Sequence, residues 1–385
     1  MTARGSTIAA AVAMLAVLGL HFATARHLEL LSRIAPLAVL NAQGTRPLTP
    51  QFAVSEADAR AAVRADPLNQ RSINIAMLAT VRTRQRAPDT AWFTALARLG
   101  WRDTASRQNL AIHHGLSNDG PALLDDVDAF LRRNQLIDEL STVLVAMEGD
   151  PEWRLRVAQR LRRHPPWRFG FLQRGSLIDD PRQLIARAHT VMTLQRSGDS
   201  VTASEVAPML PKLLAAGLGR QAFAIWRALE PAIARPIADP SFADLAAAAE
   251  PSTVPFHWQL TNGPDYAVDA IARPRPHLSI TWNGAGAPVF ALQYLSASAG
   301  RYAVVLTSPD RSPDLPNLVG VRAICGATAV IFTHTVRQSP LRLAYVADTP
   351  VPCSFPRFEL FGRSGTDSLR DRQATISAIE IASSI

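Results

Sequence analysis

The chain has 385 residues, more than a single hydrophobic core usually organises, so we expect two domains. Hydrophobic residues make up 48% of the sequence and charged residues 19%, a balance that excludes a largely disordered protein. The net charge is +8, but the basic residues are dispersed along the chain and do not gather beside stacking aromatic residues. The composition therefore argues against a nucleic-acid partner.

An apolar run near the start of the chain indicates export. A positive charge at Arg4 precedes the apolar residues 8–20, and the triplet Ala23-Thr24-Ala25 follows them. This order is typical of a secretory signal peptide, and the segment is also long enough for an uncleaved anchor. Residues 1–30 are predicted to be a signal peptide or a transmembrane anchor, and residues 31–54 a linker. Both alternatives place the protein at the bacterial inner membrane facing the periplasm, or in the periplasm after cleavage.

Residues 55–230 have the pattern of successive amphipathic helices with short breaks. Helix starts are predicted where a capping residue or a proline precedes an apolar repeat, as at Ser55, Pro88, Thr104 and Asp119. Pro165-Pro166 must interrupt a later helix, because successive prolines cannot continue one. Beyond this break, further helices are predicted after Ser204-Glu205 and after the turn Gly217-Leu218-Gly219.

Two similar stretches, Ala65-Asp66-Pro67-Leu68 and Trp101-Arg102-Asp103-Thr104, lead into equivalent helices about 36 residues apart. Residues 55–135 resemble two degenerate tetratricopeptide repeats of the kind found in proteobacterial envelope proteins. Gly115 and Ala129 match the family pattern, whereas its usual tyrosine is absent. The resemblance implies stacked helix pairs with a concave face, a surface that typically binds proteins.

The composition and the periodicity of the sequence change after residue 230. Residues 231–255 are rich in proline, alanine and acidic residues and are predicted to be a linker, and residues 256–385 alternate as strands do. Turn signals such as Asn283-Gly284 and Ser308-Pro309-Asp310 separate the strands, and the pattern predicts a β-sandwich. The strands are expected at residues 256–260, 277–282, 290–295, 301–306, 318–325, 329–336, 341–346, 357–361 and 375–381.

The order of features in residues 256–385 resembles a jelly-roll domain of the carbohydrate-binding-module or galactose-binding-like type. The supporting pieces are Pro255-Phe256-His257-Trp258, the strand at 278–282, Gly300-Arg301-Tyr302 and the closing strand at 376–381. The resemblance implies a fold more than a ligand. Trp258, Trp282 and Tyr294 are the candidate glycan-contact residues, but strand alternation favours a place in the core for them.

The only two cysteines, Cys325 and Cys353, both lie in this C-terminal part. In an oxidising compartment an isolated pair 28 positions apart is best interpreted as one disulfide, the alternative being two buried thiols. The predicted fold is therefore α+β and multidomain: an N-terminal membrane segment, a tetratricopeptide-like helical array over 55–230, and a disulfide-linked antiparallel jelly-roll sandwich over 256–385.

Residues that carry chemistry are sparse in this sequence. His113 and His114 are adjacent and are expected on different helix faces. Asp125, Asp126 and Asp128 are interpreted as carboxylates in the first turns of a helix, where the helix dipole favours negative charge. No catalytic, cofactor or metal motif is recognised. We expect a non-enzymatic envelope scaffold that has no cofactor and uses its helical array to bind a protein partner. Its layout resembles that of accessory factors for polysaccharide or protein export. The alternatives are glycan binding by the sandwich and a carbohydrate-active enzyme with an unrecognised acid pair.

Overall fold

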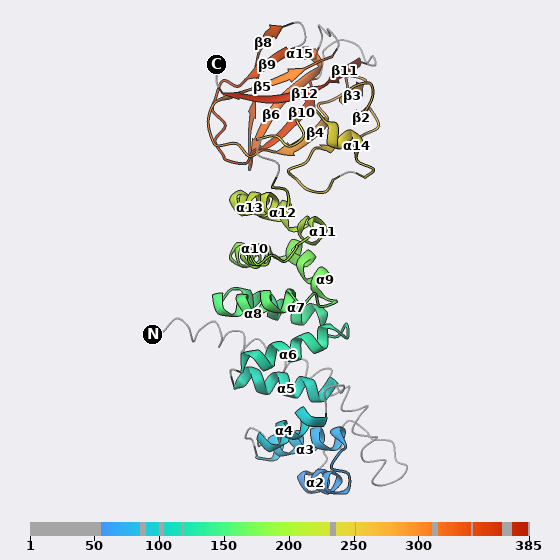
Figure 1. The fold of residues 1–385 in the computed structure, drawn as a ribbon, viewed down its shortest axis with the longest axis vertical. Coiled ribbons are helices and arrows are strands. Elements are labelled where there is room, and N and C mark those ends of the chain that lie inside the picture. The colour runs from blue at the N-terminus through green and yellow to red at the C-terminus, as the bar shows by residue number, and fades with distance from the viewer. Residues whose placement is uncertain are drawn as a thin grey trace. The chain divides into compact units, whose positions relative to one another are not determined.

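The computed structural model describes residues 55–84, 90–99, 104–117, 119–231, 236–250, 252–309, 315–339, 342–363 and 372–383. The chain divides into two compact units, with the boundary between Arg168 and Phe169, and each unit is treated by itself (Figure 1). The predicted signal or anchor and the linker that follows it lie outside the described residues. In the described part of the chain no helix combines the length and apolar character needed to cross a bilayer.

The first unit is built from helices, as predicted. Local capping explains several of the boundaries: the Ser55 side chain accepts from the Asp58 amide, Asp119 accepts from the Ala122 amide, and Asp150 caps the helix that begins at Pro151. The helices are α2 (Glu56–Ala65), α3 (Gln70–Arg84), α4 (Thr90–Leu99), α5 (Thr104–Leu116), α6 (Gly120–Leu131), α7 (Ile137–Glu148) and α8 (Pro151–Leu161).

Each of these helices packs mainly on its neighbours in the sequence. Contacts run from α2 to α3, then to α4, α5 and α6, and from α6 to α7 and α8, with additional contacts between α3 and α5 and between α6 and α8. One core cluster lies under α3, α4 and α5 and contains Ile73, Met77, Phe93, Leu96 and Leu110. Buried apolar stripes are thus covered by the next helix along the chain, the arrangement that stacked helical units require.

The second unit begins with helices and ends with sheets. Its helices are α9 (Arg168–Gln173), the short 3₁₀ helix η1 (Arg174–Leu177), α10 (Pro181–Arg196), α11 (Ala203–Val206), α12 (Met209–Ala215) and α13 (Gly219–Leu229). Thr202 and Glu205 form a capping box at the start of α11, slightly earlier than the predicted Ser204-Glu205 start. Gly219 opens α13, as the glycine-containing turn predicts.

Aromatic side chains join α13 to the sheet region within this unit. Trp226 is 2% exposed and stacks on Phe256, with ring centroids 4.8 Å apart. Phe223 contacts both Phe256 and Phe355, at 5.8 and 5.4 Å. A side chain at Gly219 would meet the Phe355 ring at 2.7 Å, so the close approach of the helix start to this ring requires glycine.

Antiparallel strands form the rest of the unit, in three sheets with the orders β1-β4-β10-β6-β7, β11-β3-β2 and β12-β5-β9-β8. The strands are β1 (Gln259–Leu260), β2 (Tyr266–Ile271), β3 (His277–Trp282), β4 (Val289–Tyr294), β5 (Tyr302–Thr307), β6 (Val319–Cys325), β7 (Thr328–Ile331), β8 (His334–Ser339), β9 (Arg342–Val346), β10 (Arg357–Gly362), β11 (Arg372–Ile376) and β12 (Ala378–Ser383). Two short helices, α14 (Ala243–Ala247) and α15 (Leu315–Leu318), accompany them. A C-terminal region of antiparallel sheets is therefore confirmed.

The sheets share one hydrophobic core, to which the predicted linker contributes. Ile237 and Phe242, from the segment between the helices and the sheets, are 3% and 0% exposed and belong to the same cluster as Trp258. The Phe242 ring lies 5.4 Å from the Trp258 ring. Part of the core of the sheets is thus formed by the chain that leads into them.

Cys325 at the end of β6 and Cys353 form the predicted disulfide. Because the bond closes a loop with a sequence separation of 28, replacing both cysteines by serine is expected to lower the free energy of unfolding by about 3 kcal/mol. Urea denaturation of the oxidised protein and the double variant, followed by circular dichroism, measures this loss. Dithiothreitol should destabilise the wild-type chain by a similar amount and leave the variant unchanged; a variant as stable as the wild type would contradict the prediction.

Candidate functional site

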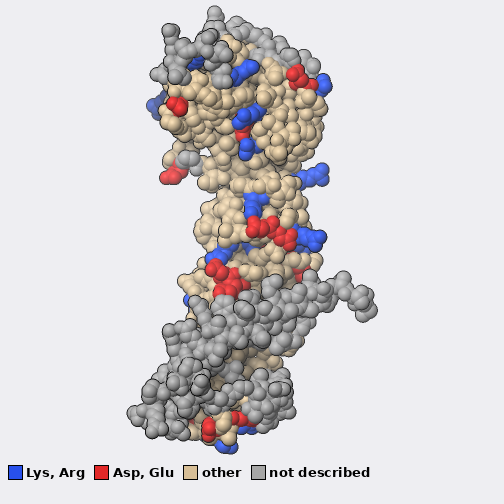
Figure 2. All heavy atoms as spheres, turned by 180° about the vertical axis from the view of Figure 1, so that it is seen from behind, with Lys and Arg blue, Asp and Glu red and all other residues tan. Residues whose placement is uncertain are grey.

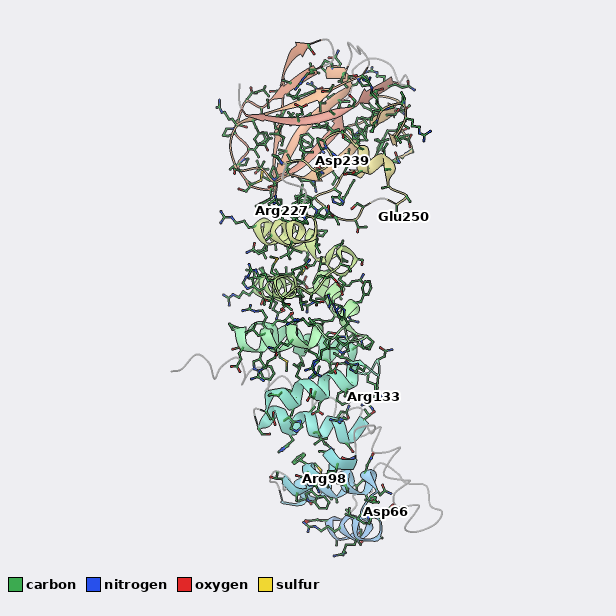
Figure 3. All side chains as sticks on the ribbon, in the orientation of Figure 1. Asp66, Arg98, Arg133, Arg227, Asp239 and Glu250 are labelled. Carbon is green, nitrogen blue, oxygen red and sulfur yellow. A yellow bond between two sulfur atoms is a disulfide. The ribbon has the colours of Figure 1, made fainter. Side chains whose placement is uncertain are left out.

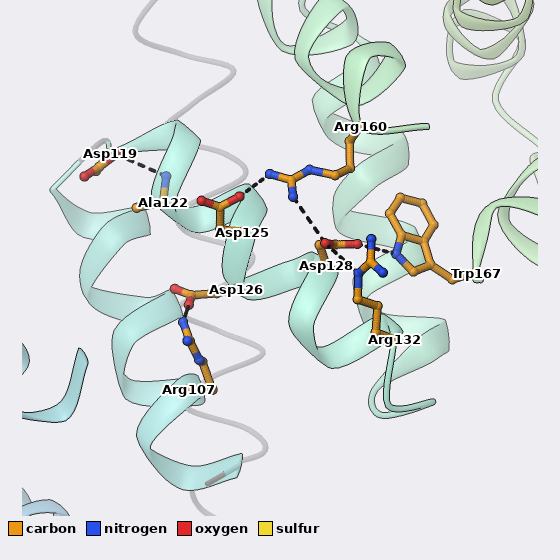
Figure 4. Close-up of polar contacts among 9 residues, drawn as sticks. All are labelled: Arg107, Asp119, Ala122, Asp125, Asp126, Asp128, Arg132, Arg160 and Trp167. Atoms are coloured by element: carbon orange, nitrogen blue, oxygen red, sulfur yellow. Dashed lines mark hydrogen bonds and ion pairs between the residues drawn. The ribbon is translucent and has the colours of Figure 1, made fainter. Parts of the chain in front are cut away.

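Asp128 on α6 is the centre of a buried polar network in the helical unit. Its carboxylate accepts hydrogen bonds from Trp167 Nε1 at 2.8 Å and from Arg132 Nε at 2.9 Å. Arg160 on α8 donates to the same carboxylate at 3.2 Å and also pairs with Asp125 (Figure 4). One carboxylate therefore ties α6 to α8 and to the turn that carries Trp167.

Asp126 makes a second connection, between α5 and α6. It is fully buried, with Arg107 Nη1 2.5 Å and His114 Nδ1 2.7 Å from its two oxygens. The neighbouring His113 does not share this site: its ring stacks on Phe93 with centroids 3.8 Å apart, and burial, aided by the charge of His114, lowers its pKa. The two histidines have different partners, as expected for different helix faces.

The three aspartates do not face a helix dipole, so that interpretation was wrong. Helix α6 begins at Gly120 and its first turn holds no acidic residue, which places Asp125, Asp126 and Asp128 in later turns. Their charge is balanced by arginine and histidine side chains from neighbouring helices. The cluster is therefore a set of structural ion pairs that hold helices together.

A third polar connection joins α3 to α5. Asn74 Nδ2 donates to Ser106 Oγ at 2.9 Å, and Asn109 Nδ2 donates to Asn74 Oδ1 at 2.8 Å. Asn74 and Ser106 are buried, so these bonds satisfy amide and hydroxyl groups that would otherwise be costly to remove from water. Specific polar pairing thus recurs along the stacked helices and fixes their register.

The three candidate glycan-contact residues do not form one exposed aromatic surface, because two of them are buried. Trp258 and Trp282 are 1% and 2% exposed, and their indole nitrogens donate to backbone carbonyls of Asp239 and Ala285. They lie in the core, as expected, although Trp258 precedes β1 and is not a strand residue, and they offer no face to a sugar. Tyr294 is different: it is partly exposed on β4, opposite Arg357 of β10.

Tyr294 belongs to a charged sheet surface that the sequence analysis missed. The register places Arg357 beside Tyr294 on one side and Ile324 on the other, and places Glu359 between Leu292 and Arg322. Directly opposed residues of antiparallel strands share a face, and the alternate residues Phe358 and Leu360 are fully buried on the core side. We call the surface formed by Leu292, Tyr294, Arg322, Arg357 and Glu359 the outer face of the five-stranded sheet.

A serine, a histidine and a carboxylate lie in series at the end of α13. Ser252 Oγ is 2.9 Å from His257 Nδ1, and His257 Nε2 is 2.8 Å from Glu230 Oε2. The serine hydroxyl also accepts from the Val254 amide, and the imidazole packs edge-on against Trp226. Since these contacts connect the helix end, the following segment and the start of the sheets, we assign them a tethering role.

The second unit also has a groove, and Ser252, His257 and Glu230 are not among the residues that line it. It has a volume of about 520 Å³ and separates Pro236, Ile237, Pro240 and Ser241 from the edge strand β12. Among the described residues no group of three or more histidine, cysteine or acidic side chains is placed to hold a metal ion.

Comparison with protein-family models finds none that matches the chain, and comparison with curated proteins finds no significant similarity.

Proposed function

We propose that the protein is a non-enzymatic interaction scaffold of the cell envelope and that its helices bind a protein partner. The observation that carries the proposal is the packing of α2–α8, in which each helix contacts mainly its neighbours in the chain. This pattern supports the tetratricopeptide-like interpretation, because stacked repeats present extended surfaces that suit proteins. The buried pairs centred on Asp126, Asp128 and Asn74 would keep such a surface in one shape.

The proposed location is the periplasmic side of the inner membrane, with residues 1–30 acting as an anchor or a cleaved signal. The Cys325–Cys353 disulfide supports an oxidising compartment, since such bonds persist outside the cytoplasm. An accessory role in polysaccharide or protein export is consistent with a scaffold held at this position. The antiparallel sheets of the C-terminal part of the chain are proposed to be of the jelly-roll class.

The proposal is tested by site-specific photocrosslinking with the full chain in its own envelope. A photoreactive residue is placed at Leu68 or Leu155, apolar helical-unit residues that are 71% and 52% exposed, and at Ile271 or Ile331 of the sheets, at 36% and 49%. We expect one discrete protein adduct from the helical positions and none from the sheet positions. Adducts that arise only from the sheets would refute the role of the helices.

A second candidate function is glycan binding by the sheets, and one specific observation favours it. Trp258 and Trp282 are buried, but Tyr294 shares an accessible sheet face with two arginines. Aromatic and guanidinium groups on one open face are a common means of holding a sugar ring and its polar substituents.

A further inference from the structure

The outer face of the five-stranded sheet contains a buried carboxylate covered by two arginines. Glu359 is 1% exposed, whereas the Arg322 and Arg357 side chains are 27% and 40% exposed. Arg322 Nε donates to Glu359 Oε2 at 2.5 Å, and Arg357 Nε lies 2.7 Å from Glu359 Oε1. The two guanidinium groups thus share one negative charge, and the three residues together carry a charge of +1 from two positive and one negative groups.

A second contact, with an aromatic ring, also orients the Arg322 guanidinium. It lies over the Phe361 ring, 4.8 Å from the centroid. A Cβ at Gly320 would come within 2.5 Å of this ring, so glycine lets Phe361 lie flat against β6. A guanidinium that is already oriented loses less conformational entropy when it binds an anion.

Several hydrogen-bond donors on this face have no partner in the described part of the chain. Arg322 uses Nε for Glu359, and neither of its terminal nitrogens makes a hydrogen bond to a described residue. Arg357 is close to Glu359 but misaligned, so its buried Nε has no hydrogen-bond partner and its contact is an ion pair only. The Tyr294 hydroxyl is likewise unbonded among the described residues.

We propose that this face binds a sugar that carries a carboxylate, that is, a uronic-acid unit of a glycan. Arg322 and Arg357 would hold the carboxylate through their terminal nitrogens, and the Tyr294 ring with Leu292 would contact the apolar face of the sugar. Glu359 is a positioning residue that orients the guanidinium groups. The inference rests on the second candidate function, glycan binding by the sheets, and is independent of the partner of the helices.

Charge and shape both favour this ligand. Glu359 is the only acidic residue in the strands of this sheet, so an anion meets no other strand carboxylate there. Figure 2 shows several Lys or Arg side chains and an acidic one near the middle of one face of the sheet-containing unit, with other charged side chains toward its edges. An acidic peptide would more commonly add to a sheet edge or enter a groove, and the outer face is neither.

The test is titration calorimetry of the full chain with oligomers of galacturonate and of mannuronate, and with their methyl esters, which carry the same rings without charge. We expect binding of a uronate oligomer, at least tenfold weaker binding of its ester, and affinity that falls with added salt. Arg357→Gln and Arg322→Gln should each weaken binding by about 10- to 100-fold. Glu359→Gln should narrow the difference in affinity between the acid and its ester, because the two guanidinium groups lose the carboxylate that orients them. Loss of stability alone would not produce this change.

Arg342→Gln is the matched control, because Arg342 is a similarly exposed strand arginine, paired with Glu380 on another sheet. It should bind like the wild type. Equal affinity for acid and ester would overturn the uronate assignment while leaving glycan binding by the sheets intact. Tighter binding of inorganic phosphate or of polyglutamate would overturn it in favour of those anions. Failure of every uronate oligomer and ester to bind would overturn the uronate assignment.

Discussion

Asp128→Ala is expected to lower the free energy of unfolding of the helical unit by about 3 to 5 kcal/mol. Asp128 is 6% exposed, and its carboxylate pairs with Arg132, Arg160 and Trp167. Its removal leaves the buried indole N–H without an acceptor and Arg160 without its buried partner. Urea denaturation followed by far-ultraviolet circular dichroism measures the change. Asp128→Asn should lose less, because the amide oxygen can still accept from Trp167.

Asp125→Ala is the matched control for this prediction. Asp125 lies on the same helix and pairs with the same Arg160, but its side chain is 63% exposed. Solvent screens such a pair, so the variant should lose less than about 1 kcal/mol. If both alanine variants lost the same free energy, the network around Asp128 would not be the element that holds α6 to α8.

Trp226→Ala is expected to destabilise the second unit by about 3 to 5 kcal/mol, the usual cost of removing a large buried aromatic side chain. The indole is 2% exposed, stacks on Phe256 and tilts against Phe223. Its loss opens a cavity between α13 and the start of the sheet region. Differential scanning calorimetry should show a lower transition temperature, together with faster proteolysis between residues 231 and 255.

Trp226→Phe provides the conservative comparison, since it keeps an aromatic ring against Phe256. It should destabilise the second unit by less than half as much as the alanine variant does, and proteolysis between residues 231 and 255 should stay slow. The prediction would be contradicted by an alanine variant whose sheets and helices unfold at the wild-type temperature. The same result would show that Phe223 alone secures the contact.

Local signals in the sequence predicted several element boundaries, but the segment expected as one strand at 329–336 is two strands, β7 and β8, in different sheets. The strand at 277–282 is confirmed by β3 at both ends, and the start at Ser55 is confirmed by its hydrogen bond to the Asp58 amide. Both depend on residues close together in the chain. The segment expected as one strand at 375–381 is instead β11 and β12, separated at Ser377. Alternation alone does not reveal that the two halves pair with different sheets.

Errors occur where a residue's role depends on distant partners. The strand Tyr266–Ile271 was missed, although its pairing with β3 is continuous, and only Gln259–Leu260 forms a strand within the predicted 256–260. Phe256 and Trp258 are buried, but they pack under other segments without strand pairing. In each case tertiary packing decides the outcome.

The candidate sites show the same limitation. Burial of Trp282 follows from the alternation of β3 and could be anticipated, whereas Trp258 lies before β1 and is buried by tertiary packing. The alternation of Arg357 and Glu359 with buried Phe358 was a signal for an outward charged face, but Arg322 is 37 positions from Glu359 and meets it only through strand pairing. An aspartate cluster in one helix is visible in sequence, whereas Arg107 and Arg160, which pair with it, come from other helices.

The packing of Trp226 and Gly219 against the sheet region affects how this chain can be divided and recombined. The helices from Phe169 onward belong to the same compact unit as the sheets, although their periodicity matches the helices before them. A graft or gene fusion that carries the sheets alone would expose Phe256 and Phe355, which α13 covers. The transferable segment should therefore begin near residue 169, so that it keeps α13 together with the sheets.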